Sequence, residues 1–188
     1  MARLTPLRPD QLSGLEDVFS VTQQRSGYVL NSYATVAHNP KVLRGVNAMS
    51  QAIMSPGAID IELKRLVGYV SGNAAGCRFC QGHRVHGAKR AGVAIEKLKA
   101  AFEYETNPMF SPAERAAMRL AQHASVQPNA ATDADFDDVK KYFTTEQIIE
   151  IMGVVALFGF WNRWNDTIKT EMESSPQAFL KKYFPELV

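Results

Sequence analysis

An unusually apolar segment in the C-terminal half limits what this chain can fold into. The run Ile151–Trp161 is interrupted only by glycines, and it lies within a predicted helix that Thr144 and Gln147 cap and that extends to about Lys169. Between residues 148 and 161 this helix is apolar on nearly all sides, so it must be buried on all sides. A membrane span needs about 20 such residues. We therefore expect a buried core helix and no membrane span, with part of its cover supplied by a second subunit.

The rest of the chain also has the pattern of helices. Alternating β-branched runs bounded by tight turns, which would indicate strands, are missing. Apolar spacing and end signals predict helices at Asp10–Gln24, Asn31–Ala37, Pro40–Met54, Ile59–Asn73, Cys77–Arg90, Ala94–Tyr104, Ser111–Ser125 and Thr132–Tyr142. No internal repeat or low-complexity linker divides the chain. We predict an all-α, single-domain helical bundle over residues 1–188, with an N-terminal helical arm (1–54) and a core (55–188).

Composition and charge exclude several classes of function. Hydrophobic residues make up 46% of the 188 residues, which is enough to bury a core without disulfide staples. The net charge is +2, and no basic stripe with interleaved aromatic residues is present, so we expect no nucleic-acid partner. Residues 1–15 lack the continuous apolar stretch of a signal peptide. We expect a cytoplasmic protein whose two cysteines are catalytic, metal-binding or incidental.

The most informative segment, residues 77–86, contains both cysteines and two histidines. Cys77 and Cys80 are three residues apart on the predicted helix, close enough for a disulfide once the first turn relaxes. In the first turn of a helix, the dipole and the free N–H groups favour a thiolate over a thiol. His83 can accept a proton from Cys80 or donate one to a departing oxygen. The segment thus supplies a nucleophile, a resolving thiol and a base, which peroxide reduction through a sulfenic acid requires.

A zinc site is the alternative interpretation of the same segment. Cys77, Cys80, His83 and His86 recur at every third position and span about 13 Å of helix at a rise of about 1.5 Å per residue. Four ligands in that layout cannot meet at one tetrahedral zinc ion with bonds of about 2.0–2.3 Å. Two or three of them could bind zinc if another helix contributed. We therefore predict no metal and no cofactor.

The other histidines and the tryptophans are assigned to structure. His38 and His123 lie near predicted helix ends, where a protonated imidazole suits the helix dipole. Trp161 and Trp164 are expected in the core or in a subunit contact. None of these four is a candidate site residue.

Further sequence features accompany the cysteine motif. They are Glu62 upstream of the motif, Ala91-Gly92 after it, Gly27-Tyr28-Val29-Leu30-Asn31, His38-Asn39-Pro40, Ser111-Pro112-Ala113-Glu114-Arg115-Ala116-Ala117 and Phe160-Trp161-Asn162-Arg163. Together with the motif they resemble the alkylhydroperoxidase D-like, or carboxymuconolactone decarboxylase-like, family in its peroxidase-related branch. The resemblance implies an all-α fold that assembles as a homo-oligomer, either a dimer, a trimer or a hexamer.

The resemblance also implies a function. It implies a thiol-dependent reductase of a small hydroperoxide, with a dithiol or lipoyl-type electron donor, in which Cys80 attacks and Cys77 resolves. The residues alone leave these roles open, because the helix dipole favours Cys77 whereas the nearby His83 favours Cys80. Two alternatives remain: a carboxymuconolactone decarboxylase-like enzyme, which does not need the cysteine pair, and a non-enzymatic redox-sensing oligomer.

Two positions depart from the family's pattern. The proton-relay glutamate usually lies twelve residues before the first cysteine, where this chain has Arg65. Glu62, one turn earlier on the same predicted helix, is the candidate replacement. The family's histidine four residues after the second cysteine is Arg84 here, and His83 and His86 flank that position. The candidate catalytic residues are Cys80, Cys77, His83, Glu62 and His86.

Overall fold

The computed structural model describes residues 2–188, apart from the side chain of Arg25, and within this range it contains helices and no strand. The α-helices are α1 (Glu16–Ser26), α2 (Asn31–Val36), α3 (Pro40–Met54), α4 (Ile61–Ala74), α5 (Arg78–Arg90), α6 (Ile95–Lys99), α7 (Pro112–Ser125), α8 (Asp133–Val139), α9 (Thr145–Ile168) and α10 (Ser174–Tyr183). Short 3-10 helices are formed by Pro9–Gln11, Ala101–Glu103 and Pro185–Leu187. The prediction of an all-α chain is confirmed.

Most helix ends lie where local sequence signals predict them. Asp60 caps α4 by accepting a hydrogen bond from the Leu63 N–H. Ser111 and Glu114 form a reciprocal capping box at the start of α7. Gly27 ends α1 in the left-handed region, at a φ of 86° that a glycine adopts without strain.

Two predicted boundaries are wrong for local reasons. The first α-helix begins at Glu16 and not at Asp10, because Pro9–Gln11 forms a separate 3-10 turn and Gly14 follows it at a φ of 80°. The helix capped by Thr132 is shorter than predicted and ends with α8, before Tyr142.

Two other segments also differ from the prediction. The predicted helix Ala94–Tyr104 is divided into α6 and a 3-10 turn, because Ala100 lies at φ −81° and ψ 1°, outside the α-helical region. The C-terminal helix α10 was not predicted. Pro176 lies in its first turn, where backbone N–H groups make no hydrogen bonds within the helix, so a proline is tolerated. Leu180 is buried and holds the helix against the core.

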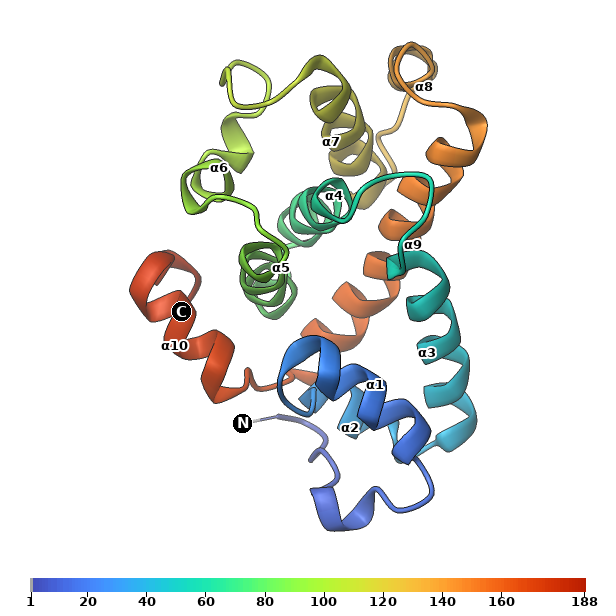
Figure 1. Cartoon of the computed structure of the whole chain (residues 1–188), viewed down its shortest axis with the longest axis vertical. Coiled ribbons are helices and arrows are strands. Elements are labelled where there is room, and N and C mark those ends of the chain that lie inside the picture. Colours follow the sequence, from blue (N-terminus) through green and yellow to red (C-terminus); the bar gives the residue numbers. More distant parts are fainter. Residues whose placement is uncertain (1) are drawn as a thin grey trace.

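The middle of the molecule is formed by α4, which packs against α5, α7 and α9. Figure 1 shows α4 and α5 side by side near the centre, with α10 along α5 and the N-terminal helices α1–α3 gathered at one end of α9. The largest apolar cluster joins Val18 and Leu43 from the N-terminal segment to Ile151 of α9 and to both cysteines. The segment 1–54 therefore shares one core with the cysteine pair.

The long helix α9 is buried along most but not all of its surface. Ile151 and Val154 are fully buried, as predicted, whereas Ala156 and Ile149 are exposed in the single chain. Complete burial of this helix was therefore wrong for the isolated chain, and cover by a second subunit stays a prediction. Within residues 2–188, no helix is long and apolar enough to cross a membrane.

A buried ion pair fixes the start of α4 to α9. The Lys64 ammonium is fully buried and donates to the carbonyls of Ile53 and Ser55 at 2.8 and 2.7 Å, and it lies 3.2 Å from the Glu150 carboxylate. That carboxylate also accepts the Ile59 N–H at 2.8 Å. Burial alone would raise the pKa of Glu150, but the hydrogen bonds from Ile59 and Lys64 outweigh it, so the pKa lies below its usual value of 4.5.

This pair predicts a pH-dependent loss of stability in Glu150→Gln. The variant leaves the Lys64 charge buried without its counter-ion, so we expect its unfolding free energy at pH 7 to be roughly 3 kcal/mol lower than that of the wild type. A carboxylate with a lowered folded-state pKa stabilises the fold above its unfolded pKa, and this contribution is lost as the pH falls through the folded value. The difference from wild type should therefore shrink as the pH falls below 4.5.

Urea unfolding at a series of pH values measures this difference. Glu103→Gln is the matched control, because Glu103 is exposed and its loss should change the unfolding free energy little. A difference between wild type and Glu150→Gln that is unchanged from pH 7 to pH 3 would contradict the prediction.

Candidate redox site

The cysteine pair lies at the start of α5. Cys77 is the N-cap residue of α5, so it precedes the helix and does not lie in its first turn as predicted. Its sulfur accepts a hydrogen bond from the Cys80 N–H at 3.2 Å, as the side-chain oxygen of an ordinary cap residue would. The two cysteines form a disulfide with a Cα–Cα distance of 5.3 Å, which lies within the usual range.

Two groups with positive partial charge lie beside the Cys80 sulfur. Cys80 lies at the positive end of α5, and the Asn165 side-chain amide on α9 donates to its sulfur at 3.7 Å. Both cysteines are almost completely buried. An added Cβ at Gly72 would lie 3.4 Å from the Cys80 Cβ, so this part of α4 lies directly against Cys80.

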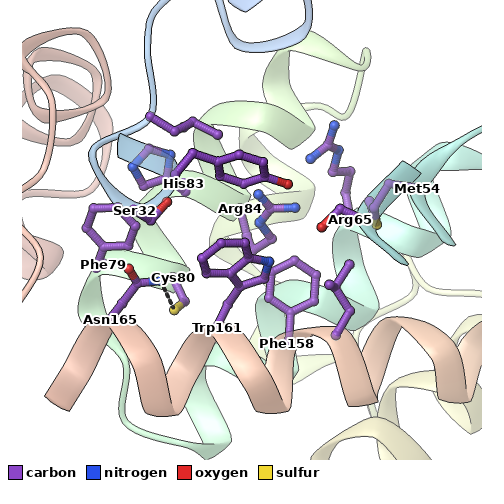
Figure 2. Close-up of a pocket in the computed structure, with 14 residues that line it drawn as sticks. Ser32, Met54, Arg65, Phe79, Cys80, His83, Arg84, Phe158, Trp161 and Asn165 are labelled. Atoms are coloured by element: carbon purple, nitrogen blue, oxygen red, sulfur yellow. Dashed lines mark hydrogen bonds between the residues drawn. The ribbon is translucent and has the colours of Figure 1, made fainter. Parts of the chain in front are cut away.

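A small cavity of about 70 Å³ lies beside Cys80 (Figure 2). Phe158 and Trp161 extend into it from α9, and Phe79 of α5 contributes a third aromatic ring. Cys77 does not line this cavity; it lines a separate depression beside Arg78 and Asp166. Of the two cysteines, Cys80 is thus the one that faces the aromatic cavity. The remaining lining residues are Leu30, Ser32, Tyr33, Ser50, Met54, Arg65, His83, Arg84, Leu157 and Asn165.

The structure gives His83 a carboxylate partner that the sequence did not reveal. His83 Nε2 lies 2.7 Å from the Glu173 Oε2, and both side chains are nearly inaccessible to solvent. The other carboxylate oxygen of Glu173 accepts the Asn31 N–H at 2.6 Å, which holds it at the start of α2. Glu173 is thus oriented toward the imidazole by a backbone contact from the N-terminal part of the chain.

Tyr28 connects the two histidines of the motif. Its hydroxyl lies 3.3 Å from the His83 Nδ1 and 3.4 Å from the His86 Nδ1. Both ring nitrogens of His83 therefore have partners other than Cys80. The relation between His83 and Cys80 is that both line the same cavity. Burial, followed by the nearby Glu173 charge, raises the pKa of Tyr28, so its hydroxyl stays protonated at neutral pH.

The candidate acid Glu62 lies away from this group. Its side chain is exposed on α4, and its carboxylate lies close to Gly92, just beyond the far end of α5. Arg65, which occupies the family's acid position, does line the cavity beside Cys80. The role of Glu62 as proton relay stays a prediction, while the carboxylate that contacts the motif histidine belongs to Glu173.

The remaining histidines have local partners. The His38 Nε2 lies 3.0 Å from the Thr5 carbonyl, and the His123 Nδ1 lies 3.0 Å from the Asp135 carboxylate. Neither histidine lines the aromatic cavity. Within residues 2–188, no three histidine, cysteine or acidic side chains are grouped as metal ligands would be.

Sequence reasoning missed Glu173, Asn165 and Tyr28. Glu173 and Asn165 reach the motif from α9 and the segment after it, and no local pattern marks either residue. Tyr28 belongs to the Gly27–Asn31 stretch that supports the family resemblance. The joint occurrence of this stretch and the cysteine motif was the one sequence signal that could have indicated a role for Tyr28.

The charges around His86 predict an acid-shifted titration. Burial is the largest cause, and the positive charges of His83 and Arg90 add to it, so the pKa of His86 lies below its usual 6.5 although Glu173 opposes the shift. Removing a positive charge favours the protonated imidazole. Arg90→Gln should therefore raise the pKa of His86 toward 6.5, as measured by NMR titration of the histidine ring signals.

Lys89→Gln is the matched control for this titration. It removes one positive charge from the adjacent, exposed position on α5, and Lys89 does not affect the pKa of His86 appreciably. Equal shifts in Arg90→Gln and Lys89→Gln would contradict the assignment of Arg90 as a specific cause.

Comparison with known proteins identifies relatives with this fold. The profile of the carboxymuconolactone decarboxylase family matches residues 40–123, which include the cysteine pair. The structure of a cysteine-to-alanine variant of the debrominase Bmp8 in complex with 2,3,4-tribromopyrrole is 33% identical in sequence, with 96% of each chain covered and a TM-score of 0.90. The alkylhydroperoxidase AhpD core of a peroxidase-related protein from Ralstonia eutropha JMP134 is 22% identical, with 93% and 90% covered and a TM-score of 0.77, and shares the fold.

A curated relative covers a shorter region. The uncharacterized protein YdfG of Bacillus subtilis is 24% identical over 89 residues, which span 47% of this chain and 60% of YdfG. The fold and the paired cysteines define an all-helical protein with a buried dithiol–disulfide centre. The chain belongs to the alkylhydroperoxidase D-like, or carboxymuconolactone decarboxylase, family.

Proposed function

We propose that this protein is a dithiol reductase in which Cys80 attacks a small electrophile and Cys77 resolves the product to a disulfide. One observation carries the proposal: of the two cysteines, Cys80 alone lines the aromatic cavity. The positive end of α5 and the Asn165 amide support a thiolate at that position. The pair returns to the dithiol form by exchange with an external dithiol or lipoyl-type donor.

The substrate that the site supports best is a small halogenated arene. Rings from Phe79, Phe158 and Trp161 line the cavity and suit a flat aromatic ligand. The Bmp8 debrominase, which shares 33% identity with this chain over nearly its whole length, has been crystallised with a brominated pyrrole. An electrophilic halogen directed at Cys80 would meet the thiolate in this cavity.

The proposed reaction transfers two electrons from the thiols to the arene. The Cys80 thiolate attacks the halogen, the carbon–halogen bond breaks, and its electron pair stays on the ring carbon, which takes up a proton. The Cys77 thiolate then attacks the Cys80 sulfur, and halide leaves. Arene halide and two thiols become arene, disulfide and hydrogen halide.

The His83–Glu173 pair is the proposed proton source for the ring carbon. The Glu173 carboxylate lies against the His83 Nε2, and the Asn31 N–H holds the carboxylate in place. His83 lines the same cavity as Cys80, so a bound substrate can contact both. His86 reaches this pair only through Tyr28, which makes it a secondary member of the network.

A hydroperoxide is the second candidate substrate, favoured by the small volume of the cavity beside Cys80. The thiolate would attack the O–O bond, an alcohol would leave with a proton from His83, and Cys77 would condense with the sulfenic acid to release water. Both reactions begin with the same Cys80 thiolate, and they differ in the substrate atom that it attacks. Homo-oligomeric assembly and a cytoplasmic location complete the proposal.

The cysteine roles predict different outcomes for the two serine variants. Cys80→Ser should abolish dithiol-dependent turnover of both tribromophenol and tert-butyl hydroperoxide, because no thiolate faces the cavity. Cys77→Ser should perform one attack and stop, leaving a sulfenic acid at Cys80 after one equivalent of peroxide. Intact-protein mass spectrometry and halide release measure these outcomes.

The same assay decides between the substrates. Halide release by the wild type with dithiothreitol, lost in Cys80→Ser, supports the arene, and alcohol formation without halide release supports the hydroperoxide. Equal turnover of either substrate in wild type and Cys80→Ser would refute a dithiol reductase altogether.

The proton source predicts a selective loss in Glu173→Gln. This variant keeps an acceptor for the Asn31 N–H but removes the negative charge beside His83, so kcat should fall by about 100-fold, the lower range for loss of an acid–base group. Disulfide formation with one equivalent of diamide, which needs no acid at the cavity, should be unchanged.

Glu62→Gln is the matched control, since it removes a carboxylate from the exposed face of α4. We expect it to retain nearly full turnover. The assignment of Glu173 fails if Glu62→Gln loses activity as strongly as Glu173→Gln does.

A further inference from the structure

A second chamber of about 230 Å³ adjoins the aromatic cavity and has a different chemical character. The two spaces share Leu30, Arg65, His83 and Arg84 in their walls. The chamber is otherwise lined mostly by polar and basic side chains, whereas the part beside Cys80 is aromatic. Its remaining lining residues are Thr22, Ser26, Tyr28, His86, Gly87, Arg90 and Ala91.

Arginine side chains dominate the charge of this chamber. Arg65 comes from α4, and Arg84 and Arg90 come from α5. No aspartate or glutamate is among the described residues that line either space. The Glu173 carboxylate contacts His83, which lines both spaces, and the Asn31 N–H.

Packing holds these arginines at the chamber wall. The Arg84 guanidinium lies 4.5 Å from the centre of the Phe158 ring, at the boundary between the aromatic and basic parts. An added Cβ at Gly87 would lie 3.1 Å from an Arg65 nitrogen, so the glycine makes room for that guanidinium. Arg90 donates to the Ser26 carbonyl. Figure 2 shows Arg65 and Arg84 above the Phe158 and Trp161 rings.

We propose that the chamber binds the anionic group of the substrate, so that the preferred substrate is a small arene bearing a carboxylate or phenolate. This inference rests on the proposed function for the reacting atom at Cys80. Guanidinium groups bind such oxygens through charge-assisted hydrogen bonds. An anion held by Arg65 and Arg84 places the ring against Phe158 and Trp161, with its far edge toward Cys80.

Size is compatible with this arrangement. An apolar cavity of about 150 Å³ accepts benzene in other proteins. The cavity beside Cys80, at about 70 Å³, is smaller than that, but it shares four wall residues with the chamber of about 230 Å³. One substituted ring can therefore occupy both parts at once.

Calorimetric titration of the oxidised, disulfide-bonded protein with benzoate and benzamide tests the proposal. The two ligands have nearly the same shape and differ in charge. We expect benzoate to bind at least tenfold more tightly than benzamide, and inorganic sulfate, which has no ring, to bind more weakly than benzoate. Equal affinities for benzoate and benzamide, or sulfate binding as tight as benzoate binding, would overturn the inference.

Variants locate the binding site. Arg65→Gln should weaken benzoate binding about tenfold, as expected for loss of one charge-assisted hydrogen bond, and leave benzamide binding unchanged. Arg65→Lys keeps the charge and should restore most of the affinity. Lys89→Gln removes an exposed charge that lies outside the chamber and should have no effect. If Lys89→Gln weakens binding as much as Arg65→Gln, the effect is net charge and the proposal is wrong.

This experiment separates the inference from the proposed function, because the oxidised protein performs no turnover. Tight benzoate binding without dithiol-dependent activity would contradict the reductase and leave the anion site in place. Turnover of neutral halogenated arenes by a protein that binds benzoate no better than benzamide would contradict the anion site alone.

Discussion

The packing of α9 against α4 and α5 is the constraint on which the rest of the site depends. The same helix provides Phe158 and Trp161 to the cavity wall, Asn165 to the Cys80 sulfur, and Glu150 to the buried ammonium of Lys64. Because one rigid helix carries all four side chains, a shift of α9 would change the cavity and the ion pair together. The apolar core and the chemistry of the site therefore share one structural support.

Features encoded by neighbouring residues could be predicted from the sequence, and features that depend on distant contacts could not. The Ser111 cap and the cysteine spacing are local, and the structure has both. Glu173 becomes part of the site only because its carboxylate binds the N–H of Asn31, 142 residues earlier. Nothing within a few residues of Glu173 indicates that contact.

The positions of Glu62 and Arg65 on α4 explain why Arg65, and not Glu62, lines the cavity beside Cys80. Residues 62 and 65 lie about one turn apart, so they share a face of α4 but not the same height along it. Arg65 is the α4 residue that lines the cavity beside Cys80. Glu62 lies a turn nearer the start of α4, opposite the end of α5 and close to Gly92. Two residues that share a helix face have side chains that point in similar directions. Contact with the cavity also requires the correct position along the helix axis.

In this chain the carboxylate beside the histidine lies just before α10, and not at the α4 position that the family uses. This difference changes the electric field across the cavity. His83 has Glu173 on one side, while Arg65 and Arg84 lie on the walls shared with the basic chamber. In a poorly solvated space these charges act strongly, because little water screens them. Positive walls favour negative charge on a bound substrate, and the Glu173 carboxylate lies against the imidazole. An arginine at the family's acid position is therefore compatible with thiol chemistry here, since the negative partner of the histidine comes from another part of the chain.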